Sequence, residues 1–217
     1  MSNHLPLAAT IAALTLASCG PKAIMLPEDP IDRAATCGVV AAAEARTATD
    51  IREVLPFEAQ SRIVHFPLLA GSAGGAFSGE AATRTSARMA ELEGGITGGK
   101  WEDLIPQCRA AYLETAKAQL ALPENRFEAQ LGCNQLADFM VTALAEQEMD
   151  YGNELSEYRD LERRLEQPLV PGLRARAGVE PAAQKAVRNE ALAAFARLGP
   201  PIAVLKLCVD RFGEKGR

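Results

Sequence analysis

The sequence predicts an all-α protein made of two tandem copies of a disulfide-closed unit of about four helices. Alanine is the commonest residue, with 40 of 217, and only 5% of residues are aromatic, which favours helices packed through small side chains over strands. Apolar residues recur at helical spacing through most of the chain. Four cysteines also form two similar intervals: Cys37 precedes Cys108 by 71 positions, and Cys133 precedes Cys208 by 75.

The first element is an apolar segment over residues 5–16. It is too short to span a bilayer, which needs about 20 apolar residues, and it is typical of the core of a secretory signal. The sequence Leu16-Ala17-Ser18-Cys19-Gly20 follows. Here the chain resembles bacterial lipoproteins, whose lipobox is an aliphatic residue, two small residues and a cysteine. The resemblance covers only this targeting segment, and Met1-Ser2-Asn3-His4 lacks the lysine or arginine that usually precedes it.

The resemblance implies that residues 1–18 are a lipoprotein signal peptide and that Cys19 becomes the lipidated first residue of the mature chain. Several acyl chains anchor a protein stably where one is marginal. Gly20 after the cysteine implies the outer membrane, with the body facing the periplasm. The alternatives are a cleaved secretory signal or a buried apolar helix with a chance cysteine. Residues 19–30, with three prolines, have the composition of a short, stiff tether.

The first copy covers residues 31–120. Its expected helices span residues 34–48, residues 51–65 with a bend at Pro56, and residues 82–96 before two glycines. A break is expected over residues 67–79. The fourth helix places Cys108 on one stripe with Trp101 and Tyr112, which are more typical of a core than of a ligand platform.

The second copy covers residues 121–217 and repeats this order. Cys133 lies on the apolar face of its first helix, and the second helix follows through residues 155–165. Pro181 suits the first turn of the third helix. The fourth places Cys208 in an apolar stripe over residues 202–212.

Other residues support the duplication. At an offset of 100, matches include Gly99 with Gly199 and Cys108 with Cys208; at an offset of 101, Pro67 matches Pro168; at the first cysteines the offset is 96. Four cysteines permit three pairings. Duplication favours Cys37 with Cys108 and Cys133 with Cys208, because an ancestral unit could have closed itself in this way.

Composition argues against several functions. The net charge of -5 and the lack of a basic run make nucleic-acid binding improbable. No C-x-x-C, haem-attachment or phosphate-loop motif is found, so we expect no cofactor. After signal removal only His65 is left among the histidines, and the four body cysteines are expected to be oxidised, so we expect no metal. An acidic cluster over residues 146–154 is typical of a solvated helix end, with weak calcium binding as the alternative.

The best candidates for ligand contacts lie beside or within two glycine-containing segments. Arg62 and His65 precede residues 71–79, predicted to be a mobile loop, and Arg174 and Arg176 lie in the equivalent segment, residues 172–178. His65 is a candidate general base, but a histidine here more often caps helix carbonyls or faces solvent.

These patterns favour a membrane-anchored periplasmic lipoprotein with a binding or structural role and an envelope protein partner, rather than an enzyme. One alternative is a small envelope hydrolase or transferase using scattered carboxylates such as Glu80, Glu91 or Glu93. Another is an inhibitor or chaperone of an exported enzyme.

Overall fold

The computed structural model describes residues 25–117 and 120–213, so the predicted signal peptide, Cys19 and most of the tether lie outside the described residues. Over the described ranges the protein is all-α, with no β-strand. The helices of the first half are α1 (Pro30–Thr47), α2 (Phe57–Gly71), α3 (Gly79–Thr97) and α4 (Ile105–Ala111), with short 3-10 turns η1 (Trp101–Leu104) and η2 (Leu113–Ala116). Those of the second half are α5 (Arg126–Ala143), α6 (Glu148–Ala177), α7 (Pro181–Ala196) and α8 (Pro201–Phe212), with η3 (Ala145–Gln147) before α6.

The two halves repeat one helix order. Both bounds of α5 lie 96 positions after those of α1, and the N-caps Asp29 and Asn125 use the same device, a side-chain oxygen that accepts from backbone N–H groups of the first turn. In each half one disulfide joins the first helix to the last, Cys37 to Cys108 and Cys133 to Cys208. These are the two pairs that the duplication favours.

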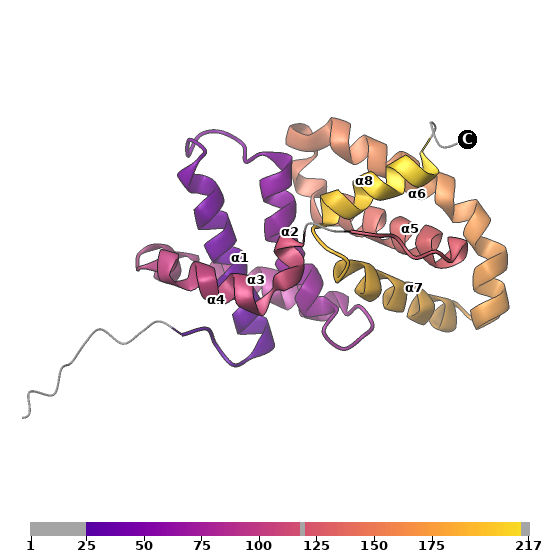
Figure 1. Cartoon of the computed structure of the whole chain (residues 1–217), viewed down its shortest axis with the longest axis horizontal. Helices are drawn as coiled ribbons and strands as arrows, with labels where there is room; N and C mark the ends of the chain where they lie inside the picture. The colour runs from indigo at the N-terminus through magenta and orange to yellow at the C-terminus, as the bar shows by residue number, and fades with distance from the viewer. Residues whose placement is uncertain (1–24, 118–119, 214–217) are drawn as a thin grey trace, which may run out of the picture.

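Helix α2 lies between the halves. Within the first half it packs with α1 and α3, and it also contacts α7 and α8 of the second half (Figure 1). The larger core belongs to the second half and extends into α2 through Leu68 and Leu69. The first half has a smaller core around its disulfide, made by Cys37, Val40, Phe66, Leu104 and Cys108.

Two predicted boundaries of α2 are wrong. The helix begins at Phe57, and Pro56 occupies the N-cap instead of bending a helix that starts at residue 51. Ile51 in the preceding segment is 79% exposed, so little burial offsets the cost of a helical proline there. The helix also continues through Pro67 to Gly71, because Leu68 and Leu69 extend its buried face.

The prediction of a second loop over residues 172–178 is also wrong. Helix α6 runs through Pro168 and Pro171 and ends at Ala177. Leu169 and Leu173 are 0% and 1% exposed, and their burial offsets the hydrogen bonds that the prolines remove. The two glycine-containing segments therefore differ in structure: one is a loop and the other is the end of a long helix.

No single helix among residues 25–117 and 120–213 is long and apolar enough to cross a membrane. Helices α7 and α8 satisfy the length and composition criteria only as a pair, with a bend of 111° between them.

Candidate functional site

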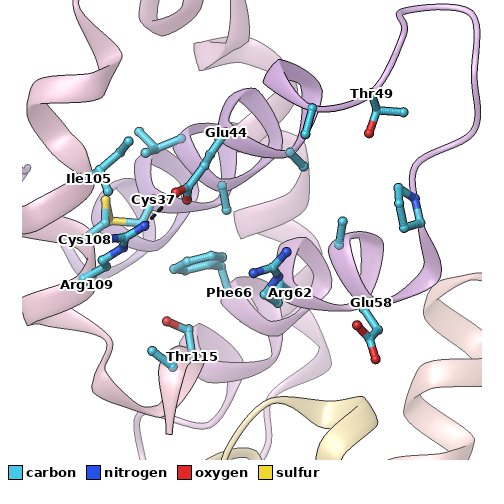
Figure 2. A pocket seen from close by; sticks show the side chains of 17 residues that line it. Cys37, Glu44, Thr49, Glu58, Arg62, Phe66, Ile105, Cys108, Arg109 and Thr115 are labelled. Carbon is cyan, nitrogen blue, oxygen red and sulfur yellow. Dashed lines mark hydrogen bonds and ion pairs between the residues drawn. A yellow bond between two sulfur atoms is a disulfide. The ribbon is translucent and has the colours of Figure 1, made fainter. Parts of the chain in front are cut away.

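The first half contains a groove of about 600 Å³ beside its disulfide. One wall is the second half of α1, with Val40, Ala41 and Ala45, and the other is α2, with Ala59, Arg62 and Phe66 (Figure 2). Ile105 and Cys108 of α4 close one end. The volume falls within the range of small-molecule sites, roughly 300–1,000 Å³. We call this space the α1–α2 groove.

Its floor is apolar because of the packing that holds the first half together. Cys37 and Cys108 are 1% and 5% exposed, and their disulfide brings α4 against α1. Phe66 is 4% exposed and packs edge-to-face against Tyr112, with ring centroids 5.3 Å apart. Small alanine side chains on α1 leave the space above this floor open.

Two ion pairs lie at the rim. Arg109 of α4 donates to Glu44 of α1 at 2.7 Å, which links two walls of the groove (Figure 2). Lys206 of α8 donates to Glu58 of α2 at 2.8 Å. This hydrogen bond and the charge of Lys206 lower the pKa of Glu58, with a smaller contribution from the charge of Arg62. Both pairs are solvent-exposed, and such pairs typically stabilise a fold by less than about 1 kcal/mol each.

Arg62 is the third cation of this region. It lies one helical turn after Glu58 on α2, beside Phe66 and across the groove from the Glu44–Arg109 pair (Figure 2). Glu58 is hydrogen-bonded to Lys206. Among the described residues, no hydrogen bond or ion pair engages the guanidinium of Arg62. Its donors are therefore available to an anion in the groove.

In the second half, larger or apolar side chains stand at the positions that correspond to the groove-lining residues of the first half. At the offset of 96, Glu44 corresponds to Met140 and Ala48 to Leu144, which are 0% and 1% exposed in the larger core. At the offset of 100, Arg109 corresponds to Val209, which packs against the same core. The α1–α2 groove of the first copy is thus open at positions where the second copy carries buried apolar side chains.

His65 does not line this groove; it does not face solvent, but it bonds a carbonyl at the end of a helix, as expected, and that helix is α7 of the second half. It lies inside α2 with 0% exposure, and its Nε2 is 2.8 Å from the carbonyl oxygen of Ala196 on α7. Its Nδ1 has no hydrogen-bond partner among the described residues. Burial lowers the pKa of His65 to about 4, against smaller opposing effects of the Ala196 carbonyl and the Glu114 charge. A neutral imidazole therefore joins the two halves.

The residue 72–78 loop is fastened to the second half. The backbone N–H of Phe77 donates to the carbonyl oxygen of Asn189 at 2.9 Å. The guanidinium of Arg197 donates to the backbone carbonyl oxygen of Ser72. Gly75 in this loop has a φ of 88°, which glycine adopts without strain. The segment predicted to be mobile is part of the contact between the halves.

Arg174 and Arg176 lie in the last turn of α6 and do not line the α1–α2 groove. The guanidinium of Arg176 stacks over the ring of Phe127, with its central carbon 3.9 Å from the ring centroid. The structure therefore does not bring these arginines together with Arg62 and His65.

The carboxylates named for a hydrolase do not form one site. Glu80 and Glu93 are exposed on α3, and Glu91 forms an ion pair with Arg88 at 2.7 Å. Partial burial raises the pKa of Asp138 on α5 and of Glu162 on α6, near the ion pair between Arg188 and Glu166. Within the described ranges, no group of three or more histidine, cysteine or acidic side chains has a metal-binding arrangement.

Sequence reasoning found Arg62 but missed Glu44, Arg109, Phe66 and the groove itself. These residues come from three helices, and only folding brings them together. The one available signal was the replacement of Met140 and Val209 by charged residues when the copies are aligned on their cysteines. No protein-family model matches the chain, and no curated protein or solved structure is significantly similar to it.

Proposed function

We propose that the protein is a lipid-anchored envelope protein with a binding role and that its ligand occupies the α1–α2 groove. The observation that carries this proposal is the open groove of about 600 Å³ in the first copy, at positions that buried Met140 and Leu144 fill in the second. A folded unit gains stability by filling such a space with apolar side chains. The first copy, in which the groove is open, lacks that stabilisation. A role in ligand binding explains why the groove is not filled.

The anchoring part of the proposal rests on the lipobox resemblance at Cys19 and on the cysteine pairs. Disulfides persist in oxidising compartments such as the bacterial periplasm. The four cysteines of the body form two disulfides, as suits a domain placed there. A binding role is preferred to catalysis because the groove pairs its two carboxylates, Glu44 and Glu58, with cations.

The binding role predicts site-specific capture in intact envelopes. We expect a photoreactive benzoylphenylalanine at Ala116, which is exposed at the groove, to form a light-dependent adduct with the bound molecule. The same residue at Ala186, an exposed alanine of α7 outside the groove, should form no such adduct. Intact-mass analysis of the purified protein measures both outcomes and gives the mass of what is captured.

Ala186 provides the matched control because both positions exchange an exposed alanine for the same large side chain. Identical adducts at both positions would reflect random collision and would contradict a binding groove. Lack of any adduct at Ala116, with the photoreactive residue verified by mass, would contradict it as well.

A further inference from the structure

Within the part of the chain that the structure describes, the α1–α2 groove combines an apolar floor with one lining cation, Arg62, that forms no ion pair. Val40, Phe66, Ile105 and the disulfide form the floor, and the carboxylates at the rim are already bound to Arg109 and Lys206. Arg62 contributes a guanidinium that forms no hydrogen bond or ion pair with another described side chain, and Glu58, on whose pKa its charge acts, is itself bound to Lys206. We propose that the ligand of this groove is a single-chain fatty acid whose hydrocarbon lies on the floor and whose carboxylate binds Arg62. This inference rests on the proposed function and names the ligand class of the same site.

The second copy shows what chemistry suits the space. At the corresponding positions it has Met140 and Leu144, whose flexible apolar side chains are 0% and 1% exposed. The helix positions that carry them are Glu44 and Ala48 in the first copy, and both line the groove. An unbranched alkyl chain can replace such side chains because it is apolar, narrow and flexible.

The entrance is also less covered than in the second copy. Leu155 of α6 is fully buried, whereas Val54, which corresponds to it at the offset of 101, is 51% exposed in the segment before α2. In the second copy helical residues begin at Glu148, with a kink at Tyr151, whereas α2 begins only at Phe57. The segment before α2 is therefore more exposed at Val54 than the corresponding helical position, Leu155, of the second copy.

Charge complementarity selects an anion over a neutral or cationic amphiphile. Glu44 is paired with Arg109 and Glu58 with Lys206, so Arg62 is the lining cation that has no ion-pair partner among the described residues, with Glu58 one turn before it as the nearest interacting charge. A guanidinium binds a carboxylate through two parallel N–H donors. Such a contact lies next to the apolar ring of Phe66, which suits a molecule with a carboxylate at the end of a hydrocarbon chain.

Calorimetric titration with decanoate tests this inference on the full-length chain carrying Cys19→Ala, so that no attached lipid competes. We expect one decanoate per chain and a Kd that rises at least tenfold in Arg62→Gln, because one charge-assisted contact is lost. Arg174→Gln, which also removes one exposed arginine but lies outside the groove, should leave the Kd within twofold. Decanol, which has the same chain without the charge, should bind the parent and Arg62→Gln equally.

A second variant tests the position of the hydrocarbon. Glu44→Met with Ala48→Leu copies the residues of the second half, and we expect it to abolish decanoate binding while the urea midpoint stays equal or rises. Decanoate binding that is unchanged in both this variant and Arg62→Gln would overturn the inference. So would tighter binding of an acetylated Ala-Ala-Leu-Leu peptide with a free carboxylate, which would assign the groove to a protein carboxyl terminus. If decanoate fails to bind but the Ala116 adduct forms in envelopes, the fatty-acid inference fails and the binding role stands; if both fail, the proposed function fails with it.

Discussion

Replacing Cys133 and Cys208 together by alanine is expected to lower the free energy of unfolding by about 4 kcal/mol. This disulfide closes a segment of 75 positions between α5 and α8. In the chain-entropy model, a cross-link of that length lowers the conformational entropy of the unfolded chain, which stabilises the folded state by about 4 kcal/mol. Both cysteines are 0% exposed in the larger core, which also contains Leu68 and Leu69 of the first half. The loss should therefore destabilise both halves, and urea unfolding followed by circular dichroism measures it.

The Cys37→Ala, Cys108→Ala double variant is the matched comparison. Its disulfide closes a segment of 71 positions, nearly the same length, but it lies in the smaller core beside the groove. Loop closure alone predicts equal losses for the two pairs, and any excess at Cys133–Cys208 measures the packing of that sulfur pair in the larger core. A loss below about 1 kcal/mol for the Cys133–Cys208 pair would contradict the disulfide-closed unit as the basis of the fold.

Acidification should weaken the protein through His65. Its pKa is about 4 in the folded protein and 6.5 when exposed, so the unfolded chain binds the proton more tightly. The contribution of neutral His65 to the free energy of unfolding is fully present above pH 6.5. It declines as the pH falls from 6.5 to 4 and is lost below pH 4. A shift of this size corresponds to a loss of about 3 kcal/mol.

Urea unfolding at pH 7.5 and pH 4 isolates this contribution when the parent is compared with His65→Gln. Glutamine keeps an N–H donor for the carbonyl oxygen of Ala196 but does not titrate. Glu114, whose charge acts on His65, is present in both proteins, as is Arg197, which binds the loop beside it. We expect the pH-dependent loss to be about 3 kcal/mol smaller in His65→Gln. Equal losses in the two proteins would show that folding does not lower the pKa of His65 and would contradict this account.

Much of the architecture follows from local patterns. Apolar spacing and the cysteine intervals predict the helix order, because both are properties of one segment or of two copies of it. The long α6 is not predictable in this way, since its prolines favour a break and only the tertiary burial of Leu169 and Leu173 outweighs them. The same limit applies to Gly132, where any larger side chain would overlap the ring of Phe195 from α7.

The candidate site was less accessible to sequence reasoning than the fold. Arg62 was named because it is near a glycine-rich segment, yet its role comes from Glu44 and Arg109, which are distant in the chain. His65 was named for the same reason, but it lies at the α2–α7 contact because position 65 is on the side of the helix that faces the second half. Whether one face of α2 is exposed or buried depends on the second copy, which no pattern within the first copy encodes.

The proposal of an exported, lipid-anchored protein closed by two disulfides is tested most directly by the intact mass of the chain isolated from membranes without reductant, after alkylation of free thiols. We expect a polypeptide that begins at Cys19, carries a diacylglycerol and a further acyl group, and takes up no alkylating reagent. A chain that still begins at Met1, bears no lipid and is alkylated at Cys37, Cys108, Cys133 and Cys208 would contradict it.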